Sequence, residues 1–214
     1  MSGFRAWFTA LPAPIRWTAL AVVSLLLVTV VAAAVWTFIG HREELAERDL
    51  GTVLVTAQRA VGSGQPSELD AAAGALRQFL TSHPRARVSA QAWYVLGQVE
   101  FRRGQWEPSA AAFGEAARRD RGSIGRLSRL GQGYAYESKG DLPKAIEAYQ
   151  QTLSGLGPKD FLYGDLLLAK ARAHELAKDS PAAIATYKQY LKDLPTSDRS
   201  QDVRIRLALL GSTG

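Results

Sequence analysis

The chain has no cysteine and only three histidines among its 214 residues. Without cysteine it forms no disulfide bond, no thiolate metal site, no cysteine nucleophile and no lipid-modified N-terminal cysteine. The histidines, His41, His83 and His174, stand far apart, and none has a second histidine or a carboxylate pair at metal-ligand spacing. We therefore expect surface or packing roles for them, and neither a metal nor a cofactor.

Sequence motifs of enzymes and of nucleic-acid-binding proteins are also missing. There is no Gly-x-Ser-x-Gly elbow and no Ser/His/Asp arrangement, so we expect no enzyme. Gly131 and Gly133 with the nearby Lys139 resemble a phosphate loop in outline, but Ser138-Lys139-Gly140 runs opposite to a Walker motif. The net charge of +6 is mild, and basic and acidic residues are interleaved. This pattern argues against nucleic acid as the main partner.

One long apolar run lies near the N-terminus, over residues 17–39, and contains no charged residue. At about 1.5 Å per residue, a helix of this length spans roughly 34 Å, enough to cross the hydrocarbon core of a membrane. Trp17 and Trp36 stand near its two ends, where amphipathic rings favour the headgroup region. The run therefore predicts a transmembrane helix over residues 17–39.

A cleaved signal peptide is the competing interpretation of this run. Arg5 and Arg16 would form its basic region, and the alanines at 32–34 offer a cleavage site. However, the run is longer than a signal peptide's apolar region of about 7–15 residues, and it continues past the alanines. An uncleaved anchor is favoured.

The orientation of the anchor depends on the basic residues on either side. Arg5 and Arg16 precede the run, whereas Arg42 and Arg48 follow it among several acidic residues. The numbers of basic residues on the two sides are nearly equal. The absence of acidic residues before the run favours a cytoplasmic N-terminus over residues 1–16. We predict a single-pass protein of the inner (cytoplasmic) membrane, with the rest of the chain in the periplasm of a Gram-negative cell.

The remainder of the chain repeats about every 37 residues, a spacing typical of helical repeats. Each repeated segment has a small residue at its sixth place and a large apolar residue at its tenth, and three have a proline near the start. Proline is tolerated in a first helical turn, so each segment predicts a helix. The four segments are SELDAAAGAL (67–76), GQWEPSAAAF (104–113), GDLPKAIEAY (140–149) and KDSPAAIATY (178–187).

A second helix is predicted before each of the last three segments, over residues 92–103, 127–138 and 165–176. Gly97, Gly133 and Ala171 recur at one place in these helices. A small residue on each partner lets two antiparallel helices approach closely, and Gly104 and Gly140 suit left-handed C-caps. The unit is a helical hairpin that packs on its neighbours.

Residues 92–120 resemble the tetratricopeptide repeat, through Trp93, Leu96, Gly97, Gly104, Trp106, Phe113 and Ala116. The resemblance extends over residues 50–195, although the first unit is degenerate. It implies an all-α chain: one N-terminal transmembrane helix, a juxtamembrane linker over 40–49, and an α-solenoid of about four hairpins. Residues 196–214 would form a capping helix and tail.

The same resemblance implies that the first helix of each hairpin lines a concave groove that binds other proteins. Tyr94, Phe101 and Tyr134 would either anchor a bound segment or close the gap between hairpins, and both readings stay open. Glu137, Asp165, Glu175 and Leu127 occupy further groove positions. The predicted partner-binding residues are Gln91, Tyr94, Gln98, Phe101, Arg102, Leu130, Tyr134, Leu168 and Arg172.

Five arginines gather between residues 118 and 129. They could bind an acidic partner or anionic lipid headgroups. The preferred interpretation is structural, because arginine at a helix C-terminus complements the helix dipole.

One membrane span followed by a few loose repeats is similar to the architecture of the YfgM-like proteins, the family of the ancillary subunit of the bacterial Sec translocon. This resemblance implies an adaptor that contacts the translocon, envelope chaperones or exported chains. The alternative is a structural subunit of an envelope machine for secretion, motility or pilus assembly. The oligomeric state is left open.

Overall fold

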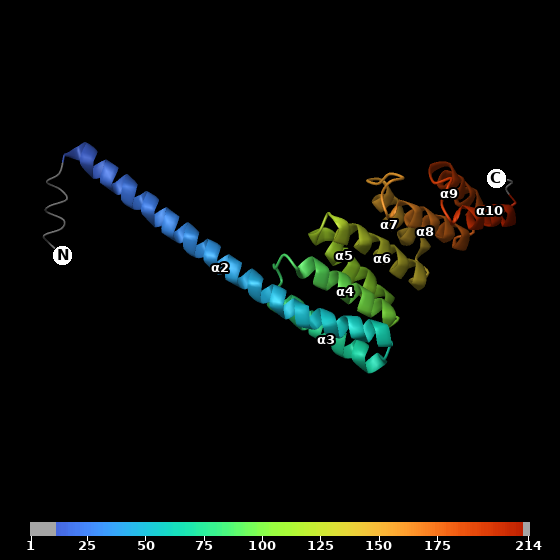
Figure 1. The fold of residues 1–214 in the computed structure, drawn as a ribbon, viewed down its shortest axis with the longest axis horizontal. Coiled ribbons are helices and arrows are strands. Elements are labelled where there is room, and N and C mark those ends of the chain that lie inside the picture. The colour runs from blue at the N-terminus through green and yellow to red at the C-terminus, as the bar shows by residue number, and fades with distance from the viewer. Residues whose placement is uncertain (1–11, 212–214) are drawn as a thin grey trace. The chain divides into compact units, whose positions relative to one another are not determined.

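In the computed structural model, which describes residues 12–211, every regular element is an α-helix (Figure 1). The predicted all-α fold is confirmed over this range. The chain divides into two units, residues 1–47 and residues 48–214. Residues 1–11 of the predicted cytoplasmic segment, and the last three residues of the predicted tail, lie outside the described residues.

The apolar run lies in helix α2 (Ala13–Ser63), the one helix of the described residues that is long and apolar enough to cross a membrane. The side chains of residues 21–39 are exposed, as are those near the two ends of the run, where Trp17 is 73% and Trp36 81% exposed. The hydroxyl of Thr29 donates to the Leu26 carbonyl at 2.8 Å, so this polar group is satisfied within its own helix. Residues 40–49, predicted as a linker, are part of the same helix.

The second unit contains the C-terminal part of α2 and eight further helices of the described chain. They run in sequence, and neighbours along the chain lie side by side (Figure 1). The predicted hairpin helices agree with them to within a few residues. The bounds are α3 (Pro66–Ser82), α4 (Ser89–Arg102), α5 (Trp106–Arg119), α6 (Ser123–Lys139), α7 (Leu142–Leu153), α8 (Tyr163–Leu176), α9 (Ser180–Asp193) and α10 (Ser200–Leu209).

The turns within the hairpins use left-handed backbone, as predicted from the glycines. Gly104 has φ 71° and Gly140 φ 87°. At the equivalent turn of the next hairpin Lys178 takes φ 59°, a conformation that strains a residue with a Cβ atom. The helices that follow the last two turns begin at the side chains of Asp141 and Asp179, which accept hydrogen bonds from backbone N–H groups of the first turn.

Large aromatic rings lie on the recurrent small residues of the first helices. A Cβ atom on Gly97 would stand 2.6 Å from the Phe113 ring, and one on Gly133 would stand 2.2 Å from the Tyr149 ring. In the first of these hairpins the Ser109 hydroxyl also donates to the Gly97 carbonyl at 2.8 Å. The lack of a side chain at Gly97 and Gly133 thus makes room for the ring at the tenth place of the repeated segment that follows each of them.

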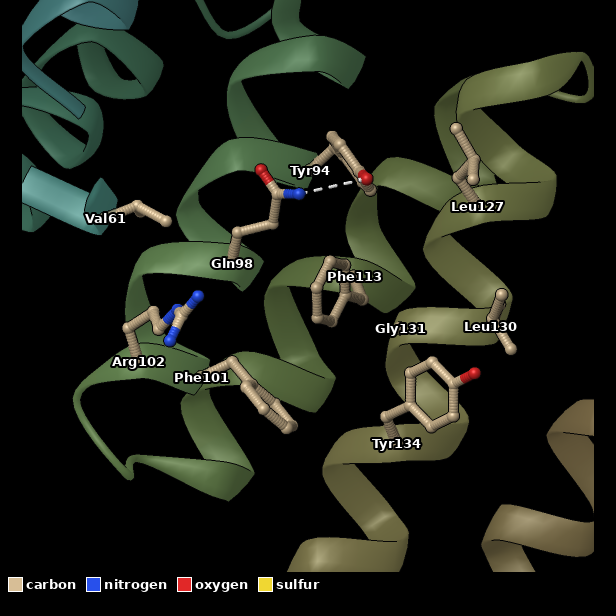
Figure 2. A pocket seen from close by; sticks show the side chains of 10 residues that line it. All are labelled: Val61, Tyr94, Gln98, Phe101, Arg102, Phe113, Leu127, Leu130, Gly131 and Tyr134. Atoms are coloured by element: carbon tan, nitrogen blue, oxygen red, sulfur yellow. Dashed lines mark hydrogen bonds between the residues drawn. The ribbon is translucent and has the colours of Figure 1, made fainter. Parts of the chain in front are cut away.

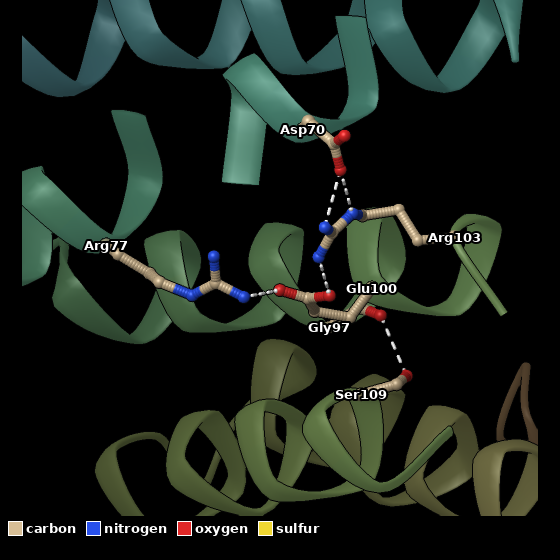
Figure 3. Close-up of polar contacts among 6 residues, drawn as sticks. All are labelled: Asp70, Arg77, Gly97, Glu100, Arg103 and Ser109. Carbon is tan, nitrogen blue, oxygen red and sulfur yellow. Dashed lines mark hydrogen bonds and ion pairs between the residues drawn. The ribbon is translucent and has the colours of Figure 1, made fainter. Parts of the chain in front are cut away.

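A buried carboxylate joins α3 to α4 (Figure 3). The side chain of Glu100 is only 1% exposed, and it pairs with both Arg77 and Arg103. Arg103 in turn donates from Nε to Asp70 Oδ1 at 2.8 Å. Because each charge has an opposite partner, the carboxylate is tolerated away from water.

Candidate groove for a partner protein

The groove is formed by α4 and α6, together with the end of α2. Side chains three or four positions apart on a helix share one face, so Tyr94, Gln98, Phe101 and Arg102 project from α4 on the same side. They line a hollow of about 530 Å³ (Figure 2). Its full lining is Val61, Tyr94, Gln98, Phe101, Arg102, Phe113, Leu127, Leu130, Gly131 and Tyr134.

A second hollow of about 670 Å³ adjoins the first. It shares with it Val61, Tyr94, Gln98 and Arg102, and it continues toward α2. Its other lining residues include Leu54, Ala57, Gln58, Gln91 and Val95. The two hollows together form one surface, which we call the α4–α6 groove.

The aromatic residues of the groove also pack inside their own hairpins. The ring centroids of Tyr94 and Phe113 are 5.8 Å apart, and those of Tyr134 and Tyr149 are also 5.8 Å apart. Phe101 meets Trp106 edge to face at 5.0 Å. These rings are therefore held in place by packing within their own hairpins while they line the groove.

The polar groups of the groove are few. Gln98 donates from Nε2 to the Tyr94 hydroxyl at 3.0 Å, and burial raises the pKa of the Tyr94 phenol. Arg102 is exposed and pairs with no carboxylate among the described residues. No aspartate or glutamate lines either hollow. The α4–α6 groove is thus apolar and aromatic, with amide groups and one positive charge.

Seven of the nine predicted residues line this groove, namely Gln91, Tyr94, Gln98, Phe101, Arg102, Leu130 and Tyr134. Leu130 is only 8% exposed and belongs mainly to the core. Leu168 and Arg172 lie instead at a separate hollow of about 260 Å³ between α8, α9 and α10. The structure therefore brings the predicted residues together in two places.

The acidic residues at the predicted groove positions hold the hairpins together. Glu137 accepts a hydrogen bond from the Tyr149 hydroxyl at 2.9 Å and from Arg172 Nε at 2.8 Å. Asp165 pairs with Arg199 at 3.1 Å. Because side chains of neighbouring repeats already pair with these carboxylates, little of their negative charge is available to a partner protein.

Several lining residues were not predicted, and most of them belong to α2 or to the floor of the groove. Val61, Leu54 and Ala57 come from α2, whose C-terminal part acts as the first helix of the first hairpin. The recurrent small residue at Ala60 was the available signal for that role. Phe113 and Gly131 form the floor of the groove, where a Cβ atom on Gly131 would stand 2.7 Å from the Phe113 ring.

The arginine cluster is largely explained by its contacts. Arg118 and Arg119 both pair with Glu115, and Arg126 pairs with Asp160 at 3.3 Å. These pairs support the structural interpretation of the cluster.

Comparison with known proteins identifies the repeats. A family model described as tetratricopeptide repeat matches residues 55–124 and 101–161, and a second model with the same description matches residues 165–197. The two matches of the first model together cover half of the chain. No curated protein matches the sequence.

Solved structures resemble the fold at low sequence identity. One contains the nearly identical TPR-like repeats of a protein described as a kinesin light chain from Podosopora anserina. It has a TM-score of 0.62 and 15% identity, and the match covers 75% of this chain and 84% of that one. The apo form of RapI gives a TM-score of 0.63 at 12% identity, over 80% of this chain and 49% of RapI. At these identities the likeness concerns the fold alone.

Proposed function

Because the chain belongs to the tetratricopeptide repeat family, we propose that it is a membrane-anchored scaffold for protein–protein interaction, and that its α4–α6 groove binds a partner. The observation that carries this proposal is the groove itself. Its hollow of about 530 Å³ presents Tyr94, Phe101 and Tyr134, which packing within the hairpins already holds in place. Aromatic side chains that are fixed before binding lose little entropy when they contact a partner.

The chemistry of the groove suits an extended segment of a polypeptide. Apolar side chains of the segment fit against the rings, and the amides of Gln58, Gln91 and Gln98 can pair with its peptide groups. Arg102 favours a segment with an acidic residue near one end. No part of this description requires a catalytic group, and the chain has no sequence motif of an enzyme.

The apolar part of α2 is proposed to anchor this groove to the inner membrane, with the N-terminus in the cytoplasm and the repeats in the periplasm. An adaptor in this position would link envelope chaperones or exported chains to a membrane complex such as the Sec translocon. The resemblance in architecture to the YfgM-like proteins supports this assignment. A structural subunit of an envelope machine would instead hold one folded partner in fixed proportion.

The experiment that tests the groove is co-purification with a charge-reversed variant of the full-length protein. Arg102→Glu alters the groove without removing an ion pair between described residues, so the fold should be kept. Arg59→Glu makes the same change at an exposed position of α2 outside the groove and serves as the matched control. We expect Arg102→Glu to lose the partners that the wild type and the control retain. Equal recovery of partner proteins by the wild type, Arg102→Glu and Arg59→Glu would refute partner binding at the α4–α6 groove.

The proteins recovered distinguish the adaptor from the machine subunit. Translocon components, chaperones and many exported chains would support the adaptor, whereas one dominant folded partner would support the subunit.

The topology can be tested separately, because the chain lacks cysteine. A single cysteine at the exposed Gln201 should react in intact spheroplasts with a maleimide that does not cross membranes. Protection of that cysteine would contradict the periplasmic assignment.

A further inference from the structure

The ion pairs of the arginine cluster leave Arg121 and Arg129 unexplained. Neither has a carboxylate partner or a hydrogen bond among the described residues. Together with Arg126 they line a hollow of about 490 Å³, which we call the arginine hollow. No aspartate or glutamate lines it, and it shares no lining residue with the α4–α6 groove.

The arginine hollow suits a phosphate group. Arg126 and Arg129 stand three positions apart on α6, so they share one face of the helix, and Arg121 precedes its first turn. A guanidinium group can donate two parallel hydrogen bonds to the oxygens of one phosphate. The side-chain amide of Gln151 and the hydroxyl of Ser154, near the end of α7, supply further polar groups.

The carboxylates of the two turns that border the hollow already accept hydrogen bonds within this region. Asp120 Oδ1 accepts from the backbone N–H of Gly125 at 2.9 Å. Asp160 Oδ2 accepts from the backbone N–H of Gly157 at 2.8 Å, and its Oδ1 accepts from Arg126 at 3.3 Å. Because three arginines stand against these two carboxylates, the hollow keeps an excess of positive charge.

The arginine hollow lies at the end of the second unit where the chain enters it. Short turns join consecutive helices that lie side by side, so these helices run in opposite directions. The turns that join successive hairpins therefore share the end at which α2 enters the unit at residue 48. Two contacts agree with this arrangement. His83 Nε2 lies 2.9 Å from Asp49 Oδ2 of α2, and Arg126 pairs with Asp160 of the α7–α8 turn.

Exposed basic and aromatic side chains occur in the same turns. Arg85, between α3 and α4, and Lys159, between α7 and α8, are exposed and have no carboxylate partner among the described residues. Phe161 follows closely on Lys159 and is 65% exposed, which makes it the most exposed aromatic side chain of residues 48–211. Basic side chains are attracted to anionic lipids, and aromatic rings favour the headgroup region of a membrane.

We propose that this end of the repeats binds an anionic membrane surface, with the phosphate of a lipid headgroup in the arginine hollow and Phe161 at the level of the headgroups. The chain's own predicted span favours lipid over other anionic ligands, because only residues 40–47 separate it from the second unit. So short a connection keeps lipid headgroups at a high effective concentration. The inference rests on the proposed membrane anchor and does not depend on the α4–α6 groove.

The test uses the full-length protein in nanodiscs, made either of phosphatidylcholine alone or of phosphatidylcholine with phosphatidylglycerol. Amide hydrogen exchange of residues 154–162 is followed by mass spectrometry. We expect exchange to be about threefold slower in the discs with phosphatidylglycerol, because headgroup contact shields this turn from water. Arg121→Glu should abolish the difference between the two lipids, and Phe161→Ala should reduce it.

Two further variants serve as controls. Arg59→Glu makes the same charge change at an exposed position of α2 outside the arginine hollow, and it should keep the full difference between the two lipids. Arg129→Gln removes a charge of the hollow without reversing it, and it should lose part of the difference. Circular dichroism confirms that each variant is folded before its exchange is compared.

The outcomes separate this site from the anchor. Equal exchange in both lipids, by a wild type that co-elutes with the discs, would refute the headgroup site and leave the anchor intact. A wild type that co-elutes with neither kind of disc would refute the anchor, and the headgroup site with it. Equal loss of the difference in Arg59→Glu would also overturn the proposal. The same slowing in phosphatidylcholine discs on addition of inorganic phosphate or polyglutamate would make a free anion or an acidic protein the occupant instead.

Discussion

The Gly133→Ala variant tests how closely the hairpin helices pack. Alanine is the better helix former by about 1 kcal/mol, so an uncrowded site would be stabilised by the change. At Gly133, however, the new Cβ atom would stand 2.2, 2.7 and 2.8 Å from three carbon atoms of the Tyr149 ring. Real Cβ atoms do not approach other atoms so closely, and either the ring or the helix must move.

The ring has little freedom to move. Tyr149 is 0% exposed, and its hydroxyl donates to Glu137 at 2.9 Å. Overpacking of a well-filled core costs about 1–3 kcal/mol. With a constrained ring we expect the upper end of this range. After subtraction of the gain in helix propensity, the net loss of stability is about 2 kcal/mol. In a folded unit of this size that loss lowers Tm by about 4–8 °C.

The assay is thermal unfolding followed by circular dichroism, with the full-length protein in detergent. Gly74→Ala is the matched control, because Gly74 lies on an exposed face of α3 with nothing within 4 Å of the position of a Cβ atom. It should raise Tm by about 2–4 °C, since only the gain in helix propensity remains. If Gly133→Ala is as stable as Gly74→Ala, the close packing of α6 on α7 is refuted.

Three further predictions follow from single residues. Lys178→Gly should stabilise the protein by about 1 kcal/mol in urea unfolding, because Lys178 takes φ 59° at the turn before α9; a loss of stability would contradict the strain. Glu100→Ala should cost about 3 kcal/mol in the same assay, because it leaves Arg77 and Arg103 without their buried partner; a cost below about 1 kcal/mol would show that the buried pair contributes little. Burial raises the pKa of the Tyr149 phenol above its ordinary value, so the phenol ionises more readily in the unfolded chain. Stability should therefore be constant below about pH 10 and fall as the pH rises above it, by up to about 1.4 kcal/mol per pH unit from this group. Tyr149→Phe should show a shallower fall in urea unfolding at pH 9–11, and an unchanged slope would refute the contribution.

Much of the fold could be predicted from local features of the sequence. The left-handed turns at Gly104 and Gly140, and the proline or aspartate at the start of the next helix, are set by residues within one turn of each boundary. The resemblance to the tetratricopeptide repeat led us to expect Tyr94, Gln98 and Phe101 on the groove side of α4, and all three line the same hollow.

Other features depend on contacts between residues far apart in the sequence. Arg172 was assigned to the groove, but it pairs with Glu137 of the preceding hairpin, about one repeat away. Such a pair depends on how successive hairpins stack, which helical periodicity does not specify. Val61 was missed for a different reason. The first unit is degenerate, so no first helix was predicted before the segment 67–76, whereas in the structure the end of α2 supplies that helix.

The central claim is that the α4–α6 groove binds other proteins, and site-specific photocrosslinking in living cells tests it most directly. A photoreactive amino acid would replace Tyr94 or Tyr134 in the anchored, full-length protein, with the exposed Glu147 of α7 as the control position. Mass spectrometry would then identify what each position contacts. The account predicts crosslinks to other proteins from both groove positions and not from the control. Absence of crosslinks at both groove positions, in a protein that is folded and inserted in the membrane, would contradict it.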